Sequence, residues 1–247
     1  MISQMKMSNT KISLFIPCFV DQFFPKIAQN TVKILTKFGF DIYINPNQTC
    51  CGQPAFNAGY RKEAYKLAKK FLIDFSNSQL IISPVASCIG FIKRHYAKIL
   101  KNTAELEIFN SLKSKMFELT DFLVNYLNVS DLGAYFPYVI TYHDSCTALR
   151  EYGIKKEPRI LLRNVKGLRL MEMKEAETCC GFGGTFSVKM PHISTSIVEK
   201  KVKSALETEA DFIVSTEASC LMNIKGFIEK NKLPIKAIHI SEILANF

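Results

Sequence analysis

The amino-acid sequence predicts an α/β protein made of two similar doubly wound units, each with a short parallel sheet. Two observations lead to this class. Short apolar runs typical of strands alternate with stretches of helical periodicity along the 247-residue chain, a pattern that favours parallel sheets with right-handed crossovers. In addition, the same order of elements occurs twice, which indicates an internal repeat.

The repeat is carried by the cysteines and by the segments around them. Every cysteine of the chain falls in a segment that has a counterpart in the other half. The halves therefore share one design, and we expect them to share one fold. The paired segments are the cysteine-terminated apolar runs 12–18 and 139–146, TCCG at 49–52 and 178–181, the runs ending in Ala-Ser-Cys at 81–88 and 213–220, and TDFL at 120–123 with SEIL at 241–244.

In the first half, the apolar spacing predicts three strands separated by helices. Apolar residues follow helical spacing over residues 24–38, and Gly39 stands where a C-terminal cap belongs. A second helix has its apolar residues on one face. The expected elements are strands within 12–18, 41–45 and 80–83, helices over 24–38, 60–75 and 91–100, and an additional helical stretch over 101–116.

The second half repeats this pattern. Four strands are expected, and helices separate the later ones. The segment 129–137 contains Ser130, Asp131, Gly133 and Pro137, so it is the expected link. We therefore expect two Rossmann-like repeats, residues 1–128 and 138–247. The strands are expected near 138–142, 168–172, 211–215 and 236–239, and the helices near 190–208 and 219–230.

The composition is that of a globular protein in a reducing compartment. No apolar run approaches the roughly 20 residues needed to span a bilayer. The first ten residues are polar and lack the apolar stretch of a signal peptide, which predicts a cytoplasmic protein with reduced thiols. In that compartment, eight organised cysteines indicate metal or redox chemistry rather than four disulfides.

The formal net charge of +10 does not by itself predict a nucleic-acid partner. The lysines are scattered over amphipathic helices, and no motif that recognises RNA or DNA is present. Solvated lysine-rich faces explain most of this charge. The remaining interpretation is docking to an acidic protein partner.

The predicted fold brings the cysteines of each half together. In a parallel sheet the loops that follow the strands share one edge, which is the usual ligand site of such folds. Each half has a lone cysteine after its first strand, a pair after the second and a lone cysteine after the third. We therefore expect one four-thiolate site in each half. The first set is Cys18, Cys50, Cys51 and Cys88, and the second is Cys146, Cys179, Cys180 and Cys220.

Four thiolates suit a [4Fe–4S] cluster, a [2Fe–2S] cluster or zinc. Structural zinc normally uses closely spaced C-x2-4-C pairs, and the chain has none. Vicinal cysteines reach separate irons of one polynuclear cluster more easily than two corners of one tetrahedron. One or two iron–sulfur clusters, most plausibly [4Fe–4S], are therefore favoured, while zinc at one site and a thiol redox device stay open. The second pair is followed by Gly181-Phe-Gly-Gly184, which predicts a more open loop than Gly52-Gln-Pro-Ala55.

Two TCCG motifs, each with a lone cysteine upstream and downstream, resemble the cysteine-rich CCG domain family. The resemblance covers nearly the whole chain. Family members include the cysteine-rich subunit of heterodisulfide reductase, the glycolate oxidase iron–sulfur subunit and lactate utilization protein A, whose cysteines hold iron–sulfur clusters within oxidoreductase complexes. The resemblance implies the same ligand role for the eight cysteines here.

The sequence differs from two of these family members, which narrows the choice of the most similar group. The heterodisulfide reductase member has a C-x-x-C at the end of each motif, whereas Val85, Phe91, Glu217 and Asn223 stand three residues from Cys88 or Cys220. The ferredoxin-like segment of the glycolate oxidase member is also missing. The chain therefore looks most like the lactate utilization group. That likeness implies L-lactate oxidation to pyruvate beside a ferredoxin-like iron–sulfur subunit and a third small subunit.

No catalytic residue is identified from the sequence. His143 and Asp144 precede Cys146 and could form an acid–base pair. A satisfied loop histidine and a turn aspartate are the more ordinary interpretation. Electron transfer is the expected function, with a heterodisulfide-reductase-like or glycolate-oxidase-like redox subunit and a non-catalytic zinc scaffold as the alternatives.

Overall fold

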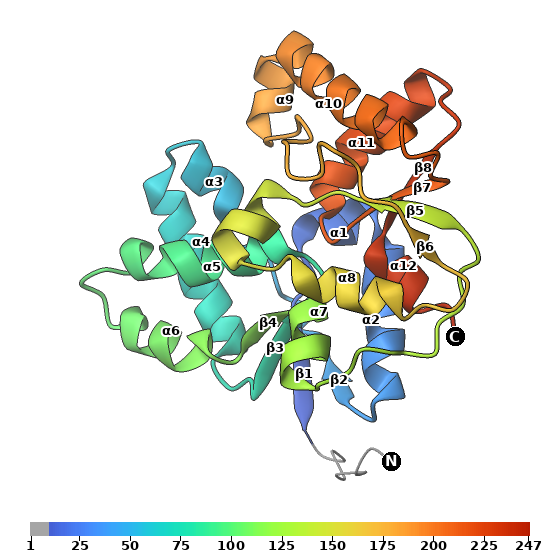
Figure 1. The fold of residues 1–247 in the computed structure, drawn as a ribbon. Helices are drawn as coiled ribbons and strands as arrows, with labels where there is room; N and C mark the ends of the chain where they lie inside the picture. The colour runs from blue at the N-terminus through green and yellow to red at the C-terminus, as the bar shows by residue number, and fades with distance from the viewer. Residues whose placement is uncertain (1–9) are drawn as a thin grey trace.

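The computed structural model describes residues 10–247 and contains two four-stranded parallel sheets (Figure 1). The polar residues 1–9, on which the expectation about a signal peptide rests, lie outside the described residues. The first sheet has the order β2-β1-β3-β4 and the second the order β6-β5-β7-β8, which confirms the predicted class. The strands are β1 (Lys11–Leu14), β2 (Asp41–Tyr43), β3 (Leu80–Ser83), β4 (Met116–Glu118), β5 (Val139–Tyr142), β6 (Arg169–Leu170), β7 (Phe212–Ser215) and β8 (Lys236–His239).

Helices separate the strands in both halves. The first half contains α1 (Cys18–Phe23), α2 (Pro25–Lys37), α3 (Gln53–Asn57), α4 (Arg61–Phe75), α5 (Ala86–Ile99), α6 (Glu105–Lys113), α7 (Leu119–Asp121) and the π-helix η1 (Phe122–Tyr126). The second half contains the π-helix η2 (Ala148–Tyr152), α8 (Lys156–Arg163), α9 (Thr185–Lys189), α10 (Pro191–Leu206), α11 (Ala218–Lys230) and α12 (Ile240–Leu244). None of the helices within residues 10–247 is both long and apolar enough to cross a membrane.

The differences from the predicted elements include α8, which no expected helix covers, and the ends of α5 and α6. The stretch expected to be helical through residue 116 ends earlier, and β4 follows α6 and pairs in parallel with β3. Helix α5 begins at Ala86 rather than at residue 91, so Cys88 lies in its first turn. Ala86 and Ile89 are buried three residues apart, which gives this first turn the apolar face that a helix packs inward.

The two halves share one hydrophobic core. One face of each sheet points into a central layer of helices (Figure 1). There α2 of the first half packs on α12 of the second, and α7 of the first half packs on α8 of the second. Strand residues of both halves are fully buried there, for example Ile12, Ile82 and Ile140. The outer faces of the sheets are covered by α4, α5 and α6 in the first half and by α10 and α11 in the second.

Further contacts between the halves lie beside the carboxyl ends of the strands. Helix α5 packs on η2, and α11 packs on α1. The first contact is close because Gly90 has no side chain: a Cβ there would lie 3.2 Å from the backbone nitrogen of Tyr152. Arg94 also donates to the carbonyl of Arg150 at 3.2 Å. The relative placement of the halves is thus fixed at their edges as well as in the core.

Equivalent residues close the last strand of each half. Glu118 ends β4 and accepts hydrogen bonds from the backbone of Thr120 at 2.7 Å and Asp121 at 3.2 Å, which caps α7. His239 ends β8 and accepts from the backbone of Ser241 at 3.2 Å, which caps α12. The TDFL and SEIL segments of the repeat are therefore the first turns of two capped helices.

Two interior helix glycines provide a matched test of the contact between the halves. Gly90→Ala gains helix propensity but places a methyl group against the backbone of η2, so we expect it to lower the free energy of unfolding by about 1 kcal/mol. Gly226→Ala in α11 has nothing within 4 Å of the new Cβ and is expected to raise it by roughly 0.5–1 kcal/mol. Urea unfolding measures both variants. Equal stabilisation by the two would contradict the close approach of α5 and η2.

Glu118 predicts a pH dependence of stability. Burial is the main reason that its pKa is raised from 4.5 to about 8, so the folded chain keeps this carboxyl protonated where an unfolded chain does not. The stability that this proton confers is complete below pH 4.5 and is lost as the pH rises through 8. We expect unfolding free energy to fall between pH 5.5 and 8.5 by on the order of 3 kcal/mol more in the wild type than in Glu118→Gln. The exposed Glu207→Gln is the control and should follow the wild type.

Candidate metal centre

The structure places each cysteine set at the carboxyl edge of its own sheet. In the first half, Cys18 is the first residue of α1, directly after β1. The pair Cys50 and Cys51 lies in the loop between β2 and α3, and Cys88 is the third residue of α5. The second half has the same arrangement: Cys146 follows β5, Cys179 and Cys180 lie between β6 and α9, and Cys220 is the third residue of α11.

Within each set the thiols interact in series, and each of the eight is a free cysteine. In the first set, Cys18 contacts Cys50, Cys50 contacts Cys51, and Cys51 contacts Cys88. The hydrogen bond to Cys50, followed by burial, raises the pKa of Cys18. Cys18, Cys50 and Cys51 have raised pKa values and therefore hold their protons unless a cation replaces them.

The second set forms the same series, from Cys146 through Cys179 and Cys180 to Cys220. Here the hydrogen bonds from Cys146 and Cys180 lower the pKa of Cys179. The hydrogen bonds to Cys179 and Cys220, together with burial, raise the pKa of Cys180. One thiol of this set thus carries negative charge that its neighbours share.

The two sets face one common cavity between the halves. All eight cysteines line this cavity, which has a volume of about 250 Å³. The volume is several times the roughly 30 Å³ that one water occupies in the liquid, so an inorganic core or a small molecule can enter. From the sequence we expect one site per half, and the structure adds that the two sites open toward each other.

Backbone donors and helix ends surround the thiols. Gly52 and Gly181 donate their N–H groups to Cys50 Sγ at 3.4 Å and Cys179 Sγ at 3.3 Å. Both glycines have φ near +85°, at 89° and 84°, a conformation that side chains disfavour. Helices α5 and α11 also begin at the cavity, and their N-termini carry partial positive charge. Together these groups stabilise negative charge on thiolates and on a bound metal core.

Each cysteine pair is held by a side chain of the helix that carries the last cysteine of its set. Tyr96 of α5 donates to the carbonyl of Cys51 at 2.8 Å, and Asn223 of α11 donates to the carbonyl of Cys180 at 2.8 Å. These residues fix the peptide that carries the inner cysteine. Asn223 is one of the positions where a further cysteine is missing from the motif, and its side chain supports the pair from there.

Glu217 is a buried carboxylate that joins the halves at the cavity. It precedes α11, and its two oxygens accept from the backbone and hydroxyl of Ser87 at 3.1 and 3.0 Å. Because Ser87 lies in the first turn of α5, Glu217 caps a helix of the other half. Burial raises the pKa of this carboxyl. In the sequence, this role is indicated only by the repeat, in which Glu217 aligns with the apolar Val85 of the first half.

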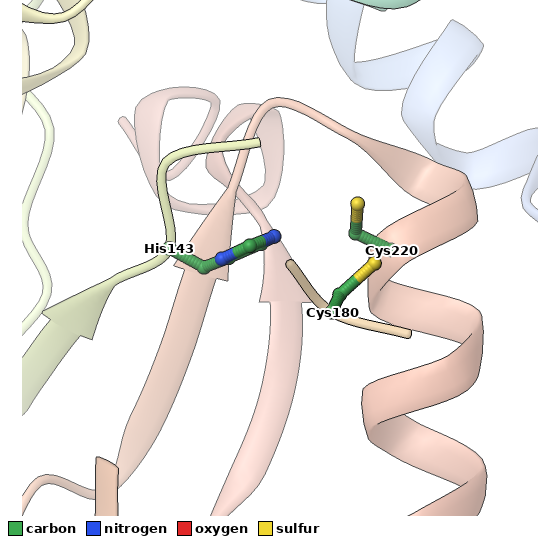
Figure 2. A group of neighbouring side chains, drawn as sticks. All are labelled: His143, Cys180 and Cys220. Atoms are coloured by element: carbon green, nitrogen blue, oxygen red, sulfur yellow. The ribbon is translucent and has the colours of Figure 1, made fainter. Parts of the chain in front are cut away.

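His143 and Asp144 do not form an acid–base pair. Asp144 accepts two hydrogen bonds from Arg159, at 2.8 and 2.7 Å, and Arg159 also binds Glu172. His143 is instead fully buried and points toward Cys180 and Cys220 (Figure 2). Burial, reinforced by Lys201, lowers its pKa to about 3, so the imidazole is neutral at physiological pH. His143 is also not the satisfied loop histidine that its position suggests, because its ring nitrogens lack hydrogen-bond partners among residues 10–247.

The two loops that follow the cysteine pairs differ. After Gly52 the chain enters α3 at once, whereas Gly183 and Gly184 extend the second loop along the cavity. Phe182 of this loop packs edge-on against Phe19 of α1, with ring centroids 5.5 Å apart. The second loop therefore reaches across to the first half.

These features suit a polynuclear metal group. Each set offers four sulfur donors that contact one another in series, a backbone N–H group beside the outer sulfur of the pair, and a cavity that all four cysteines line. The fold and the site define a duplicated parallel α/β protein with two four-thiol sites at one cavity. Residues 12–93 and 140–225 match the model of the cysteine-rich (CCG) domain, and the chain belongs to this family.

Relatives of similar length are known. The chain is 43% identical over 235 residues to lactate utilization protein A of Oceanobacillus iheyensis, covering 95% of this chain and 96% of the relative. It is 41% identical to the protein of the same name from Halalkalibacterium halodurans, again covering 95% and 96%. A hypothetical protein from Helicobacter pylori has a crystal structure that matches 96% of this chain with a TM-score of 0.68 at 12% identity. The match covers 48% of that protein and shows likeness of fold.

Two glycines of the second loop test how tightly it is built. Gly181→Ala would place a Cβ 2.6 Å from the carbonyl oxygen of Ser194 at a φ of +84°. We expect it to lower the free energy of unfolding by about 2–4 kcal/mol. Gly184→Ala has nothing within 4 Å of the new Cβ, so only the backbone cost of its φ of 61° and ψ of −111° remains, roughly 1–3 kcal/mol. If urea unfolding shows the same loss of unfolding free energy for both variants, the loop must shift to relieve the contact with Ser194.

Proposed function

We propose that this chain is an iron–sulfur electron-transfer subunit of a complex that oxidises a small 2-hydroxy acid, with L-lactate giving pyruvate as the preferred reaction. The convergence of two four-thiol sets on one cavity is the observation that carries the proposal. For metal ions with a purely structural role, we would expect each thiol set to enclose its own ion, without a cavity shared by both sets. Two sets that open toward each other suit the passage of electrons between two metal groups.

All eight cysteines would act as ligands, four to each group. The vicinal pairs favour a polynuclear iron–sulfur cluster, because adjacent sulfurs can bind separate irons. Bound clusters would supply one-electron oxidation and reduction steps. The protein's part is to hold the thiolates, to direct N–H groups and helix N-termini at them, and to bury the inner cysteines Cys51, Cys180 and Cys220 away from water.

The substrate follows from the relatives rather than from a pocket. Relatives at 43% and 41% identity carry the name lactate utilization protein A. Oxidation of L-lactate to pyruvate removes two electrons and two protons, and two one-electron centres can accept the two electrons in turn. A ferredoxin-like iron–sulfur subunit would take electrons from this chain, and a third small subunit would complete the complex. A cytoplasmic location would keep the free thiols reduced.

The experiment is metal and sulfide analysis of anaerobically purified protein with visible and EPR spectra. Two [4Fe–4S] clusters predict about eight irons and eight sulfides per chain. Cys50→Ser and Cys179→Ser each remove a donor from one set, so each should lose about half of the iron and of the visible absorption. The two variants control each other, because the untouched set should keep its cluster.

Other results would overturn this proposal in distinct ways. Zinc without iron would make the chain a scaffold and remove the electron-transfer role. Unchanged iron in Cys50→Ser would exclude the first set as a cluster site, and unchanged iron in Cys179→Ser would exclude the second. Loss of all iron in either variant would show that a single group uses thiols of both sets.

A further inference from the structure

The two metal sites differ in the residue that directly follows the first strand of each half. In the first half this residue is Phe15, which donates its backbone N–H to Ile82. In the second half it is His143, which donates its backbone N–H to Val214 in the same way, at 2.8 Å in both cases. Phe15 packs edge-on against Phe71, with ring centroids 5.1 Å apart. The repeat thus places an imidazole where the other half has an apolar ring.

His143 lies beside the inner thiols of the second set. One of its ring nitrogens and the sulfurs of Cys180 and Cys220 all lie within 4.8 Å of one another, and all three residues are buried (Figure 2). In the described part of the chain, neither ring nitrogen has a partner at hydrogen-bond geometry, even among these sulfurs. The nearby carbonyl of Ala176 acts to raise the pKa of His143, but it already accepts from Lys201 and from the backbone of Asp144. Such a buried and unpaired imidazole is costly unless something outside the chain binds it.

The polar groups around His143 are already engaged. Lys201 donates to the carbonyls of Glu175 and Ala176, and Asp144 is paired with Arg159. Neither of these two charged side chains therefore satisfies the ring. Metal–nitrogen bonds of about 2.0–2.1 Å and metal–sulfur bonds of about 2.3 Å would let one metal group bind the nitrogen and both sulfurs. Donor atoms less than 4.8 Å apart are compatible with those bond lengths.

We propose that His143 is a metal ligand of the second site, together with Cys180 and Cys220. The proposal rests on the proposed function, since it assumes that the second set binds a metal. Imidazole is neutral, so it adds a donor without adding the negative charge of another thiolate. Imidazole ligation raises the reduction potential of iron–sulfur centres. The second site would then be the better electron acceptor of the two, and electrons that enter at the first site would move toward it.

The test is a spectroscopic search for histidine nitrogen at the metal. Protein grown with 15N-histidine and with unlabelled histidine is reduced, and pulsed EPR measures the nitrogen hyperfine coupling of the cluster signals. We expect a coupling that changes with the label in the wild type. We expect the coupling to be lost in His143→Phe, which copies the residue of the first half. The exposed His192→Gln should keep it.

Redox titration provides a second readout. In His143→Phe one of the two cluster transitions should shift to a more negative potential while the other stays in place. Clusters without label-dependent nitrogen coupling in the wild type would overturn the proposal even if the variant failed to fold, because that measurement needs no substitution. Iron bound in both sites with unchanged potentials in His143→Phe would also overturn it.

The remaining outcomes separate this proposal from the proposed function. If the protein binds zinc instead of iron, the proposed function fails, and X-ray absorption at the zinc edge then decides on His143. A nitrogen neighbour at about 2.0 Å that is lost in His143→Phe would support ligation, and sulfur neighbours alone would overturn it. If no metal binds in any state, both proposals fail.

Discussion

The shared apolar core between the two sheets is the constraint on which the convergence of the two thiol sets depends. Neither half buries its inner sheet face alone, because α2, α7, α8 and α12 lie between the sheets and serve both. Residues such as Ile12, Ile140 and Val214 are fully buried in this layer, and each contributes roughly 1.5–3 kcal/mol relative to exposure. The same packing turns the carboxyl edges of the sheets toward each other. Without it, the two thiol sets would be two open rims rather than one cavity.

At several equivalent positions near the thiols, the first half has apolar residues and the second half has polar ones. At three equivalent positions the first half has Phe15, Val85 and Phe91, and the second half has His143, Glu217 and Asn223. Two of these polar residues have clear partners, because Glu217 binds Ser87 and Asn223 binds the carbonyl of Cys180. Buried polar groups cost free energy unless they are bonded. Their concentration around one set indicates that the second site differs chemically from the first.

The sequence is sufficient to predict the fold class and the composition of each thiol set. Short apolar runs that end in cysteine lead to the correct strands, because a parallel sheet needs only four or five apolar residues per strand. The recurrence of TCCG aligns the halves, and the TDFL and SEIL segments coincide with the capped helices α7 and α12. Strand β4 is missed because it has three residues and follows α6 without glycine or proline. Its alignment with 236–239 in the repeat is a signal that could have located it.

The common cavity is not predictable from these patterns, because it depends on contacts between residues distant in sequence. Gly90 lies against Tyr152, and Ser87 binds Glu217 across the halves. Periodicity identifies such residues as buried or helical, but it contains no information on which surface of the other half they meet. The position of His143 beside the thiols is hidden for the same reason. A histidine next to a cysteine motif has an ordinary explanation until its neighbours in space are known to leave its nitrogens unpaired.

Charge balance connects the cavity to its metal content. Eight thiols around about 250 Å³ cannot all ionise without compensation. Two helix N-termini and the N–H groups of Gly52 and Gly181 supply only partial positive charge. Cys50 therefore retains its proton: its hydrogen bond from Cys18 is outweighed by Cys51 and burial, which raise its pKa to about 11. In the second set, Cys179 is the thiol whose pKa is lowered by its neighbours. Iron or zinc would displace these protons, so metal binding and the charge state of the cavity are one equilibrium.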